Sequence, residues 1–282
     1  MNALKKHLYN WFSTPTQPEK PRDTAGVTYA RNEPPSLSIR NLEVCYRGRP
    51  ALQRASFEVP GGSLMAVVGP SGCGKSSLLR CINRLSDTIP QCDVRGEIML
   101  GADDILQPGM DVRRLRRRVG MVFQQSNPFP LSIADNLRFP LREHGVKGRE
   151  ELSLRVEQHL QDVGLWAEVK DRLGKPALSL SGGQQQRLCL ARTLALAPEV
   201  LLLDEPCSAL DPSATEHIEQ LIQRLKGRYT ILIVTHNLAQ ARRLADHVTV
   251  CWVDEGCGCV VESGSREGIF VNSRHPITQA YC

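Results

Sequence analysis

The octapeptide Gly-Pro-Ser-Gly-Cys-Gly-Lys-Ser at residues 69–76 decides the fold of this chain. It fits the pattern G-x-x-x-x-G-K-[S/T], in which successive backbone N–H groups wrap the phosphates of a nucleotide. The apolar run 64–68 precedes it and predicts a strand, and helical sequence follows from Lys75. Because the pattern requires this order of strand, loop and helix, we expect an α/β domain that binds a nucleotide.

Several positions of this loop have an expected part in holding phosphate. Gly72 and Gly74 have no side chain, so the backbone there can approach the phosphate oxygens closely. The helix that begins at Lys75 points the positive end of its dipole at the same oxygens. Lys75 supplies a charge to the β and γ phosphates, and Ser76 offers a hydroxyl to Mg²⁺. Cys73 is either a reactive thiol beside Lys75 or merely a small residue that fits the loop. We therefore predict ATP and Mg²⁺ as ligands, and as binding residues Gly69, Pro70, Ser71, Gly72, Cys73, Gly74, Lys75 and Ser76.

Two further apolar runs end in polar side chains that suit the same site. The run 200–203 leads into Asp204 and Glu205, and the run 231–235 leads into His236. In a parallel sheet, side chains at the carboxyl ends of such strands meet in one crevice. Asp204 can bind Mg²⁺, Glu205 can act as the base that polarises the attacking water, and His236 can sense the γ-phosphate.

The remaining sequence indicates how the chain is organised. Residues 1–35 hold five prolines and predict an extended or disordered arm, whereas folded sequence continues to about residue 270 and leaves a tail at 271–282. Between about 126 and 198 apolar residues recur at helical spacing, which indicates a helical insertion. Short buried strands that alternate with helices elsewhere imply a mostly parallel sheet. Residues 248–261 predict an antiparallel pair of strands.

Composition excludes several classes of protein. Of the 282 residues, 41% are hydrophobic and 23% charged, as in ordinary soluble proteins. No run approaches the roughly 18 apolar residues of a membrane-spanning helix, so we do not expect a pore formed by this chain alone. The net charge is only +5, and its one dense basic cluster, residues 113–118, is interpreted as a solvated helix face rather than a nucleic-acid or lipid contact.

The ten cysteines are scattered rather than paired at regular spacings. A chain of this length does not need disulfides to fold, so we interpret them as free thiols in a reducing compartment. Cys251, Cys257 and Cys259 lack a second pair of ligands at a usual zinc spacing, and a zinc site is not expected there.

The pentapeptide Leu-Ser-Gly-Gly-Gln at residues 180–184 distinguishes among the families that share the phosphate loop. Together with the motifs above, it resembles the ATP-binding subunits of ABC transporters over about residues 36–270. The resemblance implies a P-loop NTPase fold of the ABC-type ATPases: α/β, with a mostly parallel sheet core, an antiparallel β subdomain and the helical insertion. It also assigns Tyr46 to adenine stacking and Gln124, rather than its neighbour Gln125, to contact with Mg²⁺ and the attacking water.

The same resemblance implies how the chain assembles. Ser181, Gly182, Gly183 and Gln184 would face the γ-phosphate held by a second copy of the chain, so that two ATP molecules lie between two copies. Residues 208–211 would form the loop that follows the catalytic strand. Two integral-membrane permease subunits and a periplasmic or extracellular solute-binding protein would complete the assembly, with this chain peripheral on the cytoplasmic face of the bacterial inner membrane and with no nucleic-acid partner.

Short segments narrow the expected solute. Residues 81–87, 123–130, 164–173 and 205–212 look like the branch of the family that imports inorganic phosphate, and Asn-Pro-Phe-Pro at 127–130 is among the most telling pieces. The hairpin at 254–259 is longer and richer in cysteine than in that branch. The alternatives are the same motor serving another solute, such as an amino acid, or a soluble ABC ATPase without a transport role.

Overall fold

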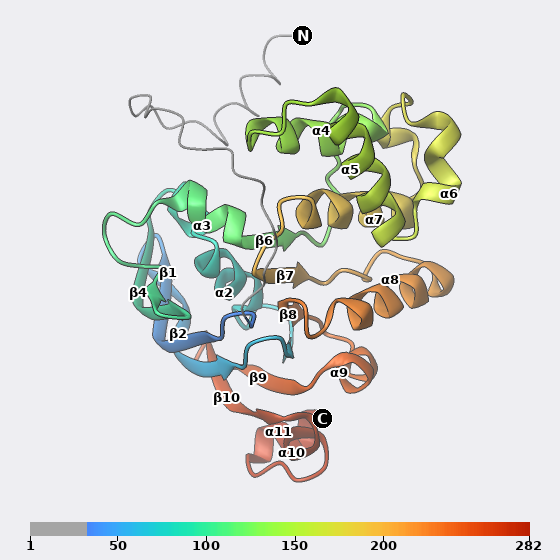
Figure 1. Cartoon of the computed structure of the whole chain (residues 1–282). Helices are drawn as coiled ribbons and strands as arrows, with labels where there is room; N and C mark the ends of the chain where they lie inside the picture. Colours follow the sequence, from blue (N-terminus) through green and yellow to red (C-terminus); the bar gives the residue numbers. More distant parts are fainter. Residues whose placement is uncertain (1–32) are drawn as a thin grey trace. The chain divides into compact units, whose positions relative to one another are not determined.

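A computed structural model of the chain describes residues 33–282 (Figure 1). The predicted arm at 1–35 lies outside the described residues except for its last three positions, which have no regular secondary structure. The loop strand β3 (Leu64–Val68) lies inside a sheet of ten strands with the order β5-β4-β1-β2-β10-β9-β3-β8-β7-β6.

The strands near the loop run parallel, as the sequence predicts. Strand β3 pairs with β8 on one side and β9 on the other, and β7 pairs with β8 and β6. Their bounds are β6 (Val119–Val122), β7 (Val200–Asp204), β8 (Thr230–Val234) and β9 (His247–Asp254). Because all five strands end their pairing at the same edge, the polar residues that follow β3, β7 and β8 are brought together.

The other half of the sheet is antiparallel. Strand β1 pairs with β2 and β4, β4 pairs with β5, and β10 returns along β9 as the predicted hairpin. The bounds are β1 (Leu37–Tyr46), β2 (Arg49–Val59), β4 (Cys92–Leu100), β5 (Asp103–Asp104) and β10 (Cys257–Ser265). Strands β2 and β10 are joined only by the short parallel pairing of Leu52 and Gln53 with Gly258 and Cys259.

The central strands are buried on both faces. Alternate residues of β3 contribute to two separate apolar clusters, with Ala66 in one and Val67 in the other. The side chains of β7 and β8 likewise alternate between the two clusters, because successive side chains of a strand point to opposite faces of the sheet. This double burial explains why these strands appear in the sequence as continuous apolar runs.

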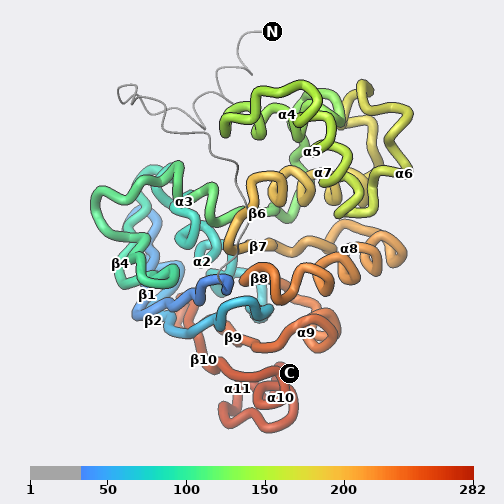
Figure 2. Tube along the Cα trace, viewed as in Figure 1, coloured from blue at the N-terminus to red at the C-terminus, as the bar shows by residue number. Residues whose placement is uncertain are grey.

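Helices cover both faces of this sheet (Figures 1 and 2). Those near the phosphate loop and the sheet ends are α2 (Lys75–Ile82), α3 (Val112–Arg118), α8 (Pro212–Leu225), α9 (Leu238–Leu244), α10 (Arg266–Phe270) and α11 (Pro276–Tyr281). Those of the 126–198 stretch are α4 (Ile133–Glu143), α5 (Arg149–Asp162), α6 (Trp166–Val169) and α7 (Gly182–Leu194). Short 3₁₀ turns occupy η1 (Leu85–Thr88), η2 (Lys170–Arg172) and η3 (Ala177–Ser179).

Helices α4, α5 and α7 pack against one another, and Figure 2 shows α4 to α7 gathered beyond the β6 edge. The stretch thus carries the predicted helical insertion, while its boundaries and those of the domain stay predictions. Within residues 33–282, none of the helices combines the length and the apolar character needed to cross a membrane.

The interpretation of residues 113–118 as a wholly solvated helix face is wrong for two of its arginines. The cluster does form helix α3, but Arg116 turns inward and donates to the backbone carbonyls of Asn83 and Arg84. Arg118 pairs with Glu199 at 2.9 Å and with Asp103 at 2.6 Å. These two guanidinium groups tie α3 to neighbouring loops, because their partners approach from distant parts of the chain.

Candidate active site

The carboxyl ends of β3, β6, β7 and β8 border one open cavity of about 530 Å³. It contains residues from the loop, from both polar strand ends that the sequence singles out, and Gln124, which the resemblance adds. The lining residues are Ala51, Ser71, Gly72, Gly74, Lys75, Ser76, Ser77, Gln124, Glu205 and His236. Of these, Ala51 and Ser77 were not anticipated, since neither belongs to a recognisable motif.

Lys75 stabilises the conformation of the phosphate loop by hydrogen bonds to the loop backbone. Its ammonium group donates to the carbonyl oxygens of Gly69 at 2.8 Å and Pro70 at 2.7 Å, and it lies 3.6 Å from the sulfur of Cys73. The side chain is buried, so it is a cation with little access to water. An anion that enters the cavity would therefore meet a charge that bulk solvent scarcely screens.

The loop glycines are required for two different reasons. Gly72 has φ +85° and faces open space, so it serves the left-handed turn and leaves the approach to the cavity clear. Gly74 also has a positive φ, but a β-carbon there would lie 2.8 Å from the carbonyl oxygen of Ala51. The absence of a side chain at Gly74 therefore allows strand β2 to pack closely behind the loop. The phosphate motif alone does not reveal this contact.

Ser76 and Asp204 form a donor set that suits Mg²⁺. The hydroxyl of Ser76 donates to a carboxylate oxygen of Asp204 at 3.2 Å, across the gap between α2 and β7. Burial raises the pKa of the Asp204 carboxyl above its usual range. A buried carboxylate beside a hydroxyl offers hard oxygen ligands, which is the type that Mg²⁺ prefers.

Glu205 connects the ends of three strands. One of its carboxylate oxygens accepts a hydrogen bond from the Gln124 amide at 3.0 Å, and the other lies 3.1 Å from Nδ1 of His236. Its backbone has φ +44°, an uncommon left-handed conformation for a residue with a side chain. Its backbone N–H donates to the carbonyl of Val234 at 2.9 Å, which ties this turn to β8.

Gln124, and not Gln125, is among the residues that line the cavity. Its contact with Mg²⁺ and the attacking water stays a prediction from the resemblance. Gln124 follows β6 directly and reaches across to the residue that follows β7. Because it also begins the stretch that leads into the helices α4 to α7, it couples the carboxylate of Glu205 to that part of the chain.

Cys73 lies inside the loop rather than on its surface. The residue is fully buried, and a hydrogen bond with the Cys251 thiol and the charge of Lys75 hold the pKa of the Cys73 thiol below its usual range, although burial acts the other way. The main cause that lowers the pKa is thus a thiol on β9, which the local sequence does not reveal.

The pentapeptide at 180–184 forms the start of helix α7 and does not line this cavity. Ser181 is the N-cap: its hydroxyl accepts from the backbone of Gln184, whose side chain accepts in return from the Ser181 backbone at 3.1 Å. Glu168 further fixes Gln184 by accepting from its amide at 2.7 Å. A β-carbon at Gly183 would lie 2.8 Å from that of Ala214, so this glycine allows α7 to pack on α8.

Tyr46 also stands apart from the cavity lining. It ends β1, opposite Arg49 and Cys92, and its ring is partly buried against the apolar cluster that includes Cys73. Its assignment to adenine therefore stays a prediction from the resemblance.

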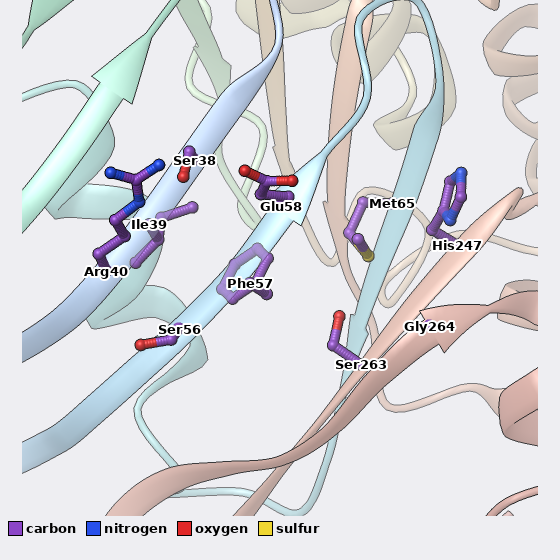
Figure 3. Close-up of a pocket in the computed structure, with 10 residues that line it drawn as sticks. All are labelled: Ser38, Ile39, Arg40, Ser56, Phe57, Glu58, Met65, His247, Ser263 and Gly264. Carbon is purple, nitrogen blue, oxygen red and sulfur yellow. The ribbon is translucent and has the colours of Figure 1, made fainter.

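A second cavity, of about 460 Å³, opens where β2 and β10 diverge (Figure 3). Its lining comes from five strands and shares no residue with the loop cavity: Ser38, Ile39, Arg40, Ser56, Phe57, Glu58, Met65, His247, Ser263 and Gly264. None of these belongs to a predicted site, so the loop cavity is the candidate active site. Among the described residues, no group of three or more histidine, cysteine or acidic side chains could hold a metal ion, and the ten cysteines are free.

Comparison with known proteins identifies the class to which this fold and site belong. Residues 52–208 match the ABC transporter family, and these make up more than half of the chain. The chain therefore belongs to the ABC transporter family, as an ATPase subunit with the α/β fold of that class. One relative is named phosphate import ATP-binding protein PstB 1, from Nitrosococcus oceani; it is 52% identical over 245 residues, which cover 87% of this chain and 88% of the relative. The resemblance drawn from the motifs is thereby confirmed.

Proposed function

We propose that this chain binds MgATP between two copies of itself and hydrolyses it to drive import of inorganic phosphate through separate permease subunits. The observation that carries the hydrolytic part is the position of Glu205, which sits at the cavity edge between Gln124 and His236 and beside the phosphate loop. The choice of phosphate rests on the printed name of the relative from Nitrosococcus oceani and on the segments noted in the sequence.

In the proposed mechanism, the loop binds the phosphates through its backbone N–H groups and Lys75. Ser76, Asp204 and Gln124 would hold Mg²⁺, which would supply positive charge to the phosphate oxygens. Glu205 accepts a proton from the attacking water, and Gln124 and His236 orient its carboxylate. Gln124 and His236 both lie within hydrogen-bonding distance of the Glu205 carboxylate, which supports this assignment of the base.

The distribution of the groups that could bind an anion supports the proposed dimer. In this proposal the N-terminus of α7, capped by Ser181, would be a second site for an anion; it does not line the cavity of its own chain. A second copy that brings its α7 over the loop would complete each site. ATP then joins the two copies and hydrolysis separates them, which would transmit motion through Gln124 and the helices α4 to α7 to the permeases.

The decisive experiment reconstitutes the chain in proteoliposomes with permease subunits of a phosphate importer, with a phosphate-binding protein outside and ATP inside. We expect ATP-dependent uptake of radiolabelled phosphate and none of labelled amino acids. Uptake of an amino acid instead would show that the transported solute is not phosphate, while the role of the chain as the ATPase of an importer would stand. Failure of the chain to associate with any membrane subunit, with ATP hydrolysis intact, would favour the soluble ABC ATPase.

A further inference from the structure

The connection from β6 to α4, residues 123–132, begins at the candidate active site. Its residues 124–128 belong to no helix or strand, and among residues 33–282 no backbone-to-backbone hydrogen bond involves them. Gln124, whose amide donates to the Glu205 carboxylate at 3.0 Å, is the first residue of this stretch. Since the backbone of the stretch makes no such bonds, side-chain contacts must set the position of Gln124.

One face of helix α7, which packs beside β6 (Figure 1), supplies these side-chain contacts. Gln186, Cys189 and Arg192 follow one another at intervals of three residues, so their side chains share a face of the helix. The guanidinium of Arg192 donates to the backbone oxygen of Asn127 at 3.0 Å and to its side-chain oxygen at 3.1 Å. The sulfur of Cys189 lies 3.8 Å from the same side-chain oxygen. The connection is therefore held against α7.

Gln186 makes the contacts that lie nearest to Gln124 along the chain. Its side-chain oxygen accepts a hydrogen bond from the hydroxyl of Ser126 at 2.7 Å, and its amide nitrogen lies 3.5 Å from the carbonyl oxygen of Phe123. These partners are the residue before Gln124 and the second residue after it. Gln186 is only 2% exposed, so water cannot readily replace the Ser126 hydroxyl if it is lost.

We propose that Gln186 is a positioning residue for ATP hydrolysis, which holds the chain on both sides of Gln124 so that the Gln124 amide stays at the Glu205 carboxylate. Gln186 does not line the loop cavity, so it acts through Gln124 and touches no substrate. Without its hydrogen bond, residues 124–128 gain conformations in which the amide leaves Glu205, and fewer molecules have an oriented base. The inference rests on the proposed function, in which Glu205 is the base and Gln124 orients it.

A purely structural role for Gln186 predicts a different result. Loss of a buried hydrogen bond that only stabilises the fold lowers the free energy of unfolding and leaves the turnover of the folded chain unchanged. Loss of a positioning bond lowers kcat of the folded chain and leaves its affinity for ATP in place, because the phosphate loop and Lys75 are untouched. The division between kcat and KM therefore separates the two roles.

The test is a double-mutant cycle on the full chain with Gln186→Met, which keeps a side chain of similar length but cannot bond Ser126 in this way, and Ser126→Ala. We expect each change to lower kcat by about five- to tenfold, the effect of one hydrogen bond on an equilibrium, with KM for ATP within about twofold. The double variant should fall no further than either single variant, because both remove the same bond. Ser126→Thr keeps the hydroxyl and should retain the kcat of the unmodified chain.

Thr230→Val is the matched control for the loss of a buried hydrogen bond. Thr230 is fully buried at the start of β8, the end of that strand that lies away from the cavity. Its hydroxyl donates to the carbonyl oxygen of Pro35 at 2.7 Å, and valine has nearly the same shape without this bond. The variant should lose stability in thermal unfolding and keep its kcat.

A kcat within about twofold of the unmodified chain in Gln186→Met or Ser126→Ala would overturn the proposal, as would effects that multiply in the double variant. So would an equal loss of kcat in Thr230→Val. Where Gln186→Met does not fold, the comparison of Ser126→Ala with Ser126→Thr decides. Gln124→Ala and Glu205→Gln test the proposed function separately. If these two keep full turnover, that function and this inference fail together; if they lose turnover while Gln186→Met and Ser126→Ala keep it, only this inference fails.

Discussion

Replacing Glu205 by glutamine tests the base at the centre of the site. The change keeps the size of the side chain and removes its ability to accept a proton. Glu205 accepts from Gln124 and contacts His236, and an amide can satisfy only one of these two neighbours with its oxygen. The cost to folding is thus one hydrogen bond, about 1 kcal/mol, whereas loss of a general base slows catalysis by about 10²–10⁴-fold.

This reduction corresponds to about 3–5 kcal/mol of activation free energy. We expect Glu205→Gln to bind ATP with nearly unchanged affinity, to hydrolyse it very slowly, and to accumulate as an ATP-bound dimer. The measurements are steady-state phosphate release, equilibrium binding of a fluorescent ATP analogue, and size-exclusion chromatography with and without ATP.

Glu199→Gln is the matched control. Glu199 precedes the other end of the same strand β7, about 15 Å from the cavity edge, and pairs with Arg118. Its turnover should equal that of the unmodified chain. If Glu205→Gln keeps turnover within about threefold of the unmodified chain, Glu205 is not the base and the reasoning fails.

Three further changes probe the loop, the metal ligands and the pentapeptide. Lys75→Ala should lose most of its ATP affinity in equilibrium binding, because it removes the buried cation of the loop; unchanged affinity would contradict this role. Burial raises the pKa of Asp204, so the folded chain holds this proton more tightly than the unfolded chain, and the group's contribution to stability is lost as pH rises through its folded pKa. Asp204→Asn should therefore raise Tm at neutral pH, by an amount that shrinks as pH falls, and should abolish Mg²⁺-dependent hydrolysis; a lowered Tm would refute the sign. Gly183→Ala should cost about 1–3 kcal/mol in urea unfolding because of its clash with Ala214, whereas Gly182→Ala, which has room, should cost less.

Most of the site follows from local sequence, because its residues occupy the ends of short strands. The loop, its strand and its helix form one continuous segment, so the residues expected to hold phosphate can be identified directly from the sequence. Glu205 and His236 line one cavity, and Asp204 contacts Ser76 of the loop, because parallel strands present their carboxyl ends at one edge. Their roles stay predictions.

The errors and omissions concern contacts between distant segments. Arg116 and Arg118 belong to a helix with an ordinary basic pattern, but their partners Asn83 and Glu199 lie far away in the sequence. Cys251 carries no motif, and its approach to Cys73 depends on the register of the β9–β10 hairpin. Such contacts depend on how distant elements pack, which local patterns do not specify.

The pairing of β3 has a consequence for synthesis of the chain. This strand carries the loop, yet both of its neighbours, β8 and β9, come from the last quarter of the sequence. While the ribosome is still adding the helices of the middle segment, β3 has no strand beside it, and the loop lacks the support of Ala51, Cys251 and Gly258 in their final places. The nascent chain must therefore remain without a working nucleotide site until β9 has emerged, so a product terminated before β9 would be unable to consume ATP.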